Sequence, residues 1–409
     1  LRAPSTVAAL GRLAAGGYVD RVDADTLIDA YRFLRRVEHA LQLEDERQTH
    51  TVPAERDERR RLARVLGYQG NRYDGPTRQL DRDLSRRRLD VRAVHERVWF
   101  RPLLDALAGA GSLGEEAAAD RLEAFGFTDL ERTRLAVREL TRGLTRSSRM
   151  MQQLLPLLLD WLSTSPDPDL GLLGLRRLAS GEDRSRALAS AFRDSPEVAR
   201  HLALLLGTSR QLGDILVANP DVIERLPTPE RLRIQGWGEL VTGARAAIGW
   251  RTDLEDRQRA LQRWQRRHLL GIAARDLYGH APVDVVGTDL SALAEASLEA
   301  ALVELDPQVP VAVVAFGRLG GAELGYASDL DVAFVHEGSG AADVAEAERV
   351  AGGLVRFLGG GTPAERVWTL DASIRPEGRN GPLTRSLEGW RGYLARWAST
   401  WERQAYLRV

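Results

Sequence analysis

Two strand-like runs frame a glycine turn and a pair of aspartates near the C-terminal end of this chain. The first run, residues 309–316, reads V-P-V-A-V-V-A-F, and the second, residues 329–336, reads D-L-D-V-A-F-V-H. Because side chains alternate between the two faces of a strand, Asp329 and Asp331 are expected on one face, with Cα atoms about 6.5 to 7 Å apart. Two negative charges at that spacing repel each other. Burial in a hydrophobic interior would not stabilise either carboxylate. The sequence therefore predicts a divalent cation that bridges the two carboxylates.

The turn between the runs predicts a phosphate beside that cation. Gly320 and Gly321 have no side chains, so the backbone can approach a phosphate closely and donate N–H groups to it. All 57 basic residues of the chain are arginines. The absence of lysine excludes a P-loop lysine and a Schiff-base lysine within this sequence. Phosphate contacts must therefore come from arginine, from backbone N–H groups or from a metal.

A third carboxylate, Asp371, ends another strand-like run at residues 366–371. The loop that follows carries Arg375 and Arg379, which suit bidentate contact with phosphate oxygens. Two acids on one strand and a third on its neighbour can hold two Mg²⁺ ions about 3.5 to 4 Å apart. One ion would activate an attacking hydroxyl, and the other would bind a triphosphate. The pattern predicts an α+β fold: a mostly helical chain with a polymerase-β-like nucleotidyltransferase core, a small mixed sheet, near its C-terminus.

Most of the remaining sequence predicts helices. Apolar residues recur at helical spacing near the N-terminus, at Leu27, Tyr31, Leu34, Val37 and Leu41. A Gly-rich joint at residues 108–114 is the expected first domain boundary. Residues 165–169 read S-P-D-P-D and resemble a D-x-D motif, but the proline predicts a helix N-cap region instead. Near the C-terminus, one buried helix stripe is expected from Leu387, Trp390, Leu394, Trp397 and Trp401.

Composition excludes several classes of function. The formal net charge of −1 argues against a broad nucleic-acid-binding surface. The arginine runs at residues 59–61 and 86–88 are interpreted as solvated helix faces. No apolar stretch approaches the 18 residues of a membrane helix, so no membrane partner is expected. The chain has no cysteine, which excludes disulfides, thiolate zinc sites and cysteine nucleophiles within it.

Longer strings resemble the glutamine synthetase adenylyltransferase family. They are residues 316–331 (F-G-R-L-G-G-A-E-L-G-Y-A-S-D-L-D), 370–383 (L-D-A-S-I-R-P-E-G-R-N-G-P-L) and 393–408 (Y-L-A-R-W-A-S-T-W-E-R-Q-A-Y-L-R). Residues 31–42 and 48–53 resemble the helical end of that family's first catalytic module. The resemblance spans nearly the whole chain. It implies transfer of AMP from ATP to a tyrosine of glutamine synthetase with Mg²⁺, a cytoplasmic location, and the PII signal protein as a second partner.

The resemblance also implies roles for individual residues. The metal ligands and catalytic acids would be Asp329, Asp331 and Asp371. The nucleotide would be bound by Gly320, Gly321, Ser328, Arg318, Arg375 and Arg379. Two positions depart from the family pattern: Arg318 stands where lysine is usual, and Ser373 replaces the first arginine of a D-x-R-x-R-P loop. The second departure puts one phosphate or substrate contact in doubt.

Family members carry an N-terminal module that removes AMP and a C-terminal module that adds it. The order of motifs places the aspartate pair in the adding module. The expected layout is a helical bundle ending the removing module (1–108), a helical linker (109–150) and an adenylyltransferase module (151–409), which comprises a helical part (151–300), the core (301–385) and the start of a C-terminal helical bundle (386–409). Because the chain begins with Leu1 and stops within a helical pattern, we expect a piece of a longer protein, whose activity in isolation is in question.

Three alternatives remain open at this point. The same site would also suit phosphorolysis, which removes AMP from the tyrosine. Residues 1–300 would alternatively serve as a regulatory docking scaffold for the PII protein. Antibiotic and RNA-end nucleotidyltransferases share the Gly–Asp layout, but they lack the R-P-E-G-R-N-G-P-L and W-E-R-Q-A strings found here.

Overall fold

The protein is described by a computed structural model that covers residues 3–45, 51–70, 74–95, 98, 115–141, 146–226, 232–233, 236–362 and 365–406. The chain divides into two compact units, Leu1–Asp160 and Trp161–Val409. The division falls inside helix α8 (Arg146–Ser163), the helix that also contains the expected start of the second module at residue 151. The expected joint at residues 108–114 lies outside the described residues.

Among the described residues of the first unit, the regular elements are helices. Its helices are α1 (Thr6–Ala15), α2 (Arg21–Asp45), α3 (Arg56–Val65), α4 (Pro76–His95), α6 (Glu115–Ala124), α7 (Leu130–Thr141) and most of α8. One core cluster joins Val37 and Leu41 of α2 to Leu62 of α3 and Leu80 of α4. The predicted stripe on α2 is only partly buried, because Tyr31 and Leu34 on the same helix are exposed.

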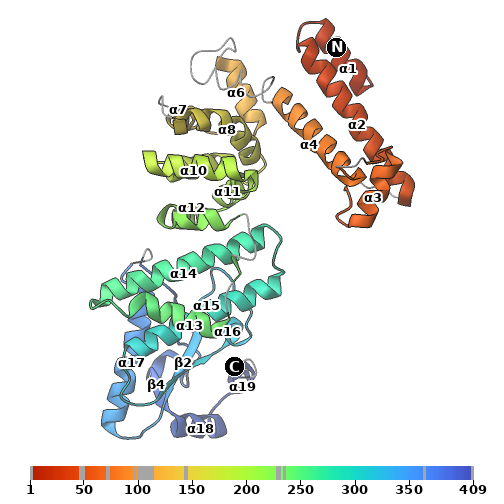
Figure 1. Cartoon of the computed structure of the whole chain (residues 1–409). Helices are drawn as coiled ribbons and strands as arrows, with labels where there is room; N and C mark the ends of the chain where they lie inside the picture. The colour runs from red at the N-terminus through yellow and green to blue at the C-terminus, as the bar shows by residue number, and fades with distance from the viewer. Residues whose placement is uncertain are drawn as a thin grey trace. The chain divides into compact units, whose positions relative to one another are not determined.

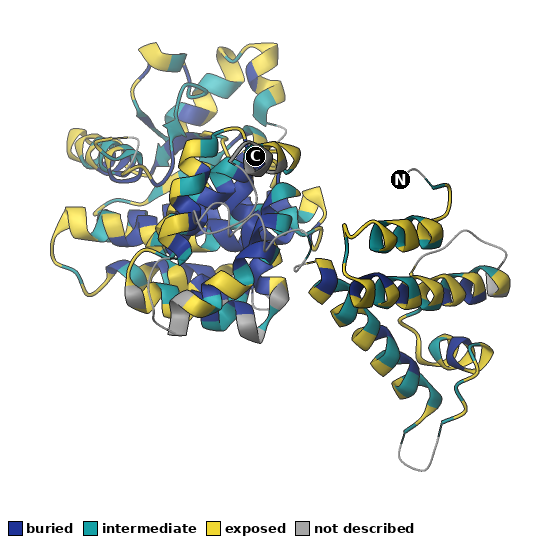
Figure 2. Cartoon of the chain, turned by 90° about the horizontal axis from the view of Figure 1, so that it is seen from above, coloured by how far each residue is buried: buried dark blue, intermediate teal, exposed yellow. Residues whose placement is uncertain are grey.

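The second unit begins with helices and ends in an α+β core (Figure 1). Its described helices are α9 (Pro168–Leu178), α10 (Glu182–Asp194), α11 (Pro196–Thr208), α12 (Arg210–Ala218), α13 (Trp237–Ile248), α14 (Leu254–Leu277), α15 (Val283–Glu304), α16 (Gly317–Gly320), α17 (Ala341–Gly359), α18 (Leu387–Arg396) and α19 (Thr400–Ala405). Helices α13, α14 and α15 pack together, with α11 and α12 against α14 and with α17 against α15. In Figure 2 the buried residues gather in the interior of this unit.

Four short strands form the sheet, with β2 (Leu330–His336) at its centre. Strand β1 (Val311–Ala315) pairs antiparallel with Val332–His336 of β2. On the other side, β3 (Leu370–Asp371) pairs parallel with the start of β2, and β4 (Thr384–Ser386) pairs parallel with its end. The predicted small mixed sheet and α+β class are confirmed. Strand β3 is shorter than the predicted run at 366–371, and β4 lies directly after the Gly/Pro loop at 373–383, where no strand is predicted from the sequence.

One face of β2 carries both packing residues and a candidate catalytic acid. Side chains two residues apart on a strand share a face, so Asp331 lies on the same face as Ala333 and Val335. Ala333 belongs to a core cluster with Phe316 and Trp390, and the partly buried Val335 packs against it. Helix α18, which carries Trp390, thus covers this face while Asp331 stands at its open end.

The predicted tryptophan stripe is wrong at its C-terminal end. Trp390 is buried at 6% exposure, but Trp397 and Trp401 are 76% and 62% exposed. Helix α18 ends at Arg396 and α19 starts at Thr400, so the interruption breaks the helical periodicity that the spacing assumed.

Two further observations concern the start of α9 and the length and hydropathy of the helices. The prediction of an N-cap in the S-P-D-P-D segment is confirmed, because Asp167 accepts a hydrogen bond from the backbone N–H of Leu170 at 2.9 Å and caps α9. Among the described residues, none of the helices is both long enough and apolar enough to cross a membrane.

Candidate active site

Asp331 and Asp371 are direct register partners in the parallel pair of β2 and β3. Their Cα atoms therefore stand on neighbouring strands, roughly 4.8 Å apart in the hydrogen-bonding direction. The pairing is fixed next to the acids, because Leu330 donates its backbone N–H to the carbonyl of Thr369 at 2.8 Å. Asp329 is exposed and comes one residue before β2 begins. The sheet thus brings Asp331 and Asp371 together, and Asp329 directly precedes the first residue of β2.

The electrostatics show that these three carboxylates interact. The pKa of Asp331 is raised, first by burial and then by the negative charges of Asp371 and Asp329. The positive charge of Arg318 acts in the opposite direction. A cation between the acids would relieve this repulsion. The donor set, which consists only of carboxylate oxygens, suits a hard ion such as Mg²⁺.

Asp371 has a different environment. Hydrogen bonds from Ser373 are the main cause that lowers its pKa, and the backbone N–H of Ser373 lies 2.8 Å from Oδ1. The charges of Arg379 and Arg375 lower it further. Ser373, the position that departs from the family pattern, therefore supports the ionised form of Asp371. The pair combines one carboxylate that resists ionisation with one that favours it.

Gly317 lies against the side chain of Asp331. Its φ is +57°, in the left-handed region that glycine tolerates, and a β-carbon placed on it would lie 2.6 Å from Oδ2 of Asp331. The strand ends are held by a hydrogen bond of 2.8 Å from the N–H of Phe316 to the carbonyl of Asp331. Gly317 was not among the predicted site residues, although its place directly after a strand-like run is a signal that could have identified it.

The predicted glycine turn forms the short helix α16. The N–H groups of Gly320 and Gly321 donate to the carbonyls of Phe316 and Gly317 at 3.0 and 3.1 Å. These two donors are therefore engaged within the turn itself. Because neither glycine has a side chain, both leave the backbone of the turn open to close approach.

Arg318, in the same turn, contacts Ser328. The Ser328 hydroxyl oxygen accepts from the N–H of Gly325 at 3.1 Å and lies 3.4 Å from Nη1 of Arg318. Arg318 is exposed, and its charge reaches Asp331. This arrangement brings one cationic and one hydroxyl group, both predicted from sequence, to the edge of the acid cluster.

Arg375 holds its own loop together. Its guanidinium donates to the carbonyls of Ala372 at 2.7 Å, Gly381 at 3.2 Å and Arg379 at 3.2 Å. Three of its five N–H groups are thus engaged by the backbone of the loop that follows β3. The exposed Arg379 side chain acts on Asp371 through its charge.

No group of three or more acids and histidines stands ready to hold a metal ion among the residues that the structure describes. That finding is compatible with Mg²⁺, which usually takes one or two carboxylates together with substrate phosphates and waters. The carboxylates of Asp329, Asp331 and Asp371, at the edge of the sheet, fit such an ion. The metal ligands stay a prediction.

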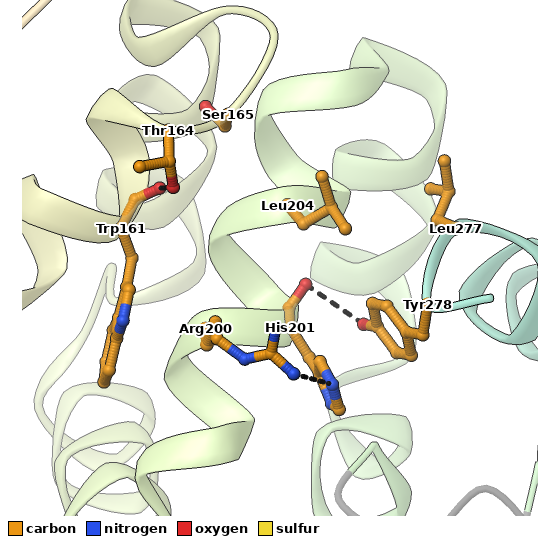
Figure 3. Close-up of a pocket in the computed structure, with 8 residues that line it drawn as sticks. All are labelled: Trp161, Thr164, Ser165, Arg200, His201, Leu204, Leu277 and Tyr278. Atoms are coloured by element: carbon orange, nitrogen blue, oxygen red, sulfur yellow. Dashed lines mark hydrogen bonds between the residues drawn. The ribbon is translucent and has the colours of Figure 1, made fainter. Parts of the chain in front are cut away.

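A separate cavity of about 280 Å³ lies among the helices of the second unit (Figure 3). It is lined by Trp161, Thr164, Ser165, Arg200, His201, Leu204, Leu277 and Tyr278. A guanidinium can only donate, so Nε2 of His201 accepts from Arg200 at 3.2 Å and Nδ1 donates to the carbonyl of Leu226 at 3.2 Å. Burial also lowers the pKa of His201, which favours the neutral ring.

Tyr278 completes the wall of that cavity. Its ring stacks on His201 at 3.8 Å, and its hydroxyl donates to the carbonyl of His201 at 3.0 Å. The polar groups of these two side chains are therefore satisfied by the protein itself. The residues that line this cavity include no carboxylate.

Two family models match separate parts of the chain. The family "Glutamate-ammonia ligase adenylyltransferase" matches residues 199–409, which contain the whole candidate site. Residues 1–99 match the family "GlnD PII-uridylyltransferase".

Curated relatives match along the entire chain. Bifunctional glutamine synthetase adenylyltransferase/adenylyl-removing enzymes from Streptomyces avermitilis and Mycobacterium tuberculosis are each 37% identical to it over 100% of its length. The match covers 44% and 43% of those two proteins. The chain thus spans less than half the length of these relatives. The resemblance inferred from the sequence strings is confirmed, and the chain belongs to the glutamate-ammonia ligase adenylyltransferase family.

Proposed function

We propose that this chain carries the module that transfers AMP from ATP to a tyrosine hydroxyl of glutamine synthetase. The tyrosine oxygen forms a bond to the α-phosphorus, and the bond from that phosphorus to the leaving pyrophosphate breaks. The observation that carries the proposal is the register pairing of Asp331 with Asp371 beside the glycine turn. Family membership supports the class of reaction, and the names of the relatives support glutamine synthetase as substrate.

The three aspartates are proposed to bind Mg²⁺ ions next to the reacting phosphates. Two Mg²⁺ ions bound by Asp329, Asp331 and Asp371 would neutralise the triphosphate and lower the pKa of the attacking hydroxyl. Burial and repulsion destabilise the charge on Asp331, so this carboxylate gains most from a cation beside it. Ser373 keeps Asp371 ionised and in place for the same task.

The residues around the acids are proposed to bind the nucleotide. Gly320 and Gly321 allow the polyphosphate to approach the turn closely, because neither has a side chain. Arg318, whose charge acts on Asp331, and Arg379, whose charge acts on Asp371, are both exposed and suit contact with phosphate oxygens. Ser328 holds the turn that carries Arg318. Arg375 organises the loop from which Arg379 extends. Catalysis would then rest on positioning and on charge stabilisation.

The first unit is proposed to contain the end of an adenylyl-removing module, within residues 1–108. The relatives are named as enzymes that both add and remove AMP. The match of residues 1–99 to a uridylyltransferase family supports an origin in a second nucleotidyltransferase module. We therefore assign AMP addition to the module proposed at residues 151–409, with a helical linker at 109–150 before it. Phosphorolysis is the competing direction for the same aspartates.

The PII signal protein is a second proposed partner. A helical scaffold at residues 1–300 would bind it, and the match to a PII-uridylyltransferase family over residues 1–99 supports this proposal. Immobilised PII protein should retain the intact gene product. Failure to retain it, both with ATP and without ATP, would remove PII from the proposal and leave AMP transfer untouched.

The proposed reaction is tested with the intact gene product, glutamine synthetase, Mg²⁺ and ATP labelled in the α-phosphate. Label should appear on glutamine synthetase together with an equimolar amount of pyrophosphate. In a separate reaction, glutamine synthetase that already carries AMP from an independent source is incubated with the same protein and inorganic phosphate. Fast phosphate-dependent release of ADP, without any forward labelling, would assign the aspartates to AMP removal instead.

A further inference from the structure

The loop between α16 and β2 is attached to two helices that precede the sheet in sequence. It starts after Gly321 and leads directly into Asp329, so its position determines where that acid and Ser328 stand. Leu324 donates its backbone N–H to the hydroxyl oxygen of Ser291 on α15 at 3.3 Å. Tyr326 donates its hydroxyl to a carboxylate oxygen of Asp276 on α14 at 2.8 Å.

A close backbone approach makes the first of these attachments possible. A β-carbon on Gly287 of α15 would lie 3.1 Å from the Cα of Glu323, so glycine lets the loop touch the helix. The neighbouring Ala322 has φ +55°, a conformation that residues with a side chain rarely adopt. Such a conformation persists only where the surroundings fix it. The loop is therefore held in place by its contacts with the helices.

The second attachment rests on a buried ion pair. Arg275, the residue before Asp276, pairs with Asp289 of α15 at 2.6 Å, and their side chains are only 8% and 18% exposed. This pair ties the last turn of α14 to α15. Asp276 consequently presents its carboxylate from a fixed backbone, whereas Tyr326 is 44% exposed and reaches it from the loop.

We propose that Tyr326 and Asp276 are positioning residues whose hydrogen bond fixes the loop carrying Ser328 and Asp329 for nucleotidyl transfer, an inference that rests on the proposed function. The hydroxyl–carboxylate bond is charge-assisted, which makes it one of the stronger hydrogen bonds available to a partly exposed side chain. Tyr326 lies two residues before Ser328, which in turn contacts Gly325 and Arg318. The bond therefore also affects the positions of Gly325 and Arg318, which Ser328 contacts.

The test compares four variants of the intact gene product in the AMP-transfer assay. Tyr326→Phe removes only the hydroxyl, and Asp276→Ala removes the acceptor. Each should lower kcat roughly tenfold, with little change in the KM for ATP. The double variant should lose no more than either single variant, because both remove the same bond. Asp276→Asn retains an acceptor oxygen and should recover most of the activity.

Tyr278→Phe is the matched control. It removes a tyrosine hydroxyl two residues from Asp276, but that hydroxyl donates to the carbonyl of His201 and not to the loop. Its kcat should equal that of the unmodified protein. A Tyr326→Phe variant with full kcat, or losses that add in the double variant, would overturn the proposal.

Hydrogen exchange separates this proposal from the proposed function. Amides of Gly321, Glu323 and Gly325 are hydrogen-bonded within or beside the loop. Tyr326→Phe and Asp276→Ala should accelerate their exchange, whereas Tyr278→Phe should not. If the unmodified protein transfers no AMP, the proposed reaction fails. Unchanged exchange in both variants would show that the hydrogen bond does not fix the loop.

Discussion

The carboxylate of Asp331 occupies the space in which a side chain on Gly317 would have to stand. A β-carbon on Gly317 would lie 2.6 Å from Oδ2 of Asp331, closer than real β-carbons approach other atoms. The backbone of the glycine turn and the central acid of the candidate site are therefore fitted to each other. This fit links a sequence feature, a glycine that directly follows a strand, to the placement of a reacting group.

Gly317→Ala should therefore displace Asp331. The variant also forces a φ of +57° on a residue with a side chain, which costs about 1–2 kcal/mol. A displacement of about 1 Å at a reacting group lowers the rate of AMP transfer on the order of a hundredfold. The initial rate of glutamine synthetase labelling measures it. Gly359→Ala is the control, because nothing lies within 4 Å of its β-carbon and its φ is not in the positive range. Equal rates for the two variants would contradict the fit.

Arg375→Lys should loosen the loop that follows β3. A lysine keeps the charge, but its single ammonium group cannot reach three carbonyls held by a planar guanidinium. Amide exchange at Gly378 and Gly381, whose N–H groups bond within this loop, should become faster. The matched Arg379→Lys variant should leave that exchange unchanged, because the Arg379 side chain is exposed. Unchanged exchange in Arg375→Lys would refute the organising role.

His268 should make the stability of the second unit depend on pH. Burial, with the nearby charges of Arg225 and Arg267, lowers the pKa of His268 to about 4 from 6.5. The unfolded chain therefore binds a proton between pH 6.5 and 4 that the folded chain excludes. The unfolding free energy should fall as pH falls through this window, by at most about 3 kcal/mol from this residue.

The measurement is the denaturant midpoint of the second unit's unfolding transition at pH 7 and pH 5. In His268→Gln the midpoint should fall less on acidification than in the unmodified protein. His39→Gln, in the first unit, should follow the unmodified protein. A drop of equal size in all three proteins would show that His268 does not contribute.

The sequence was sufficient to predict the sheet's centre and the acids on it. The runs that became β1 and β2 are β-branched and apolar, and they are joined by a glycine turn, so local signals and tertiary structure agree. The pattern also predicted that Asp371 would lie beside the aspartate pair. Register pairing with Asp331 follows that expectation.

Other features depended on contacts that no local pattern carries. Strand β4 is three residues long and exists because it pairs with the end of β2, some 50 residues away in sequence. Asp276 is one acid among many on a charged helix, and only the folded chain brings it to Tyr326. The tryptophan stripe failed for a related reason: its spacing assumed one continuous helix, but the helix is interrupted after Arg396.

The central claim is that Asp331 of β2 and Asp329, directly before that strand, carry AMP transfer. Its most direct test is the rate of label transfer from α-labelled ATP to glutamine synthetase by the Asp329→Asn plus Asp331→Asn variant. Glu337→Gln, an exposed acid just beyond the other end of β2, is the matched control. The account predicts a loss of at least roughly a hundredfold in the aspartate variant and an unchanged rate in the control. Label transfer that survives both aspartate substitutions would contradict it.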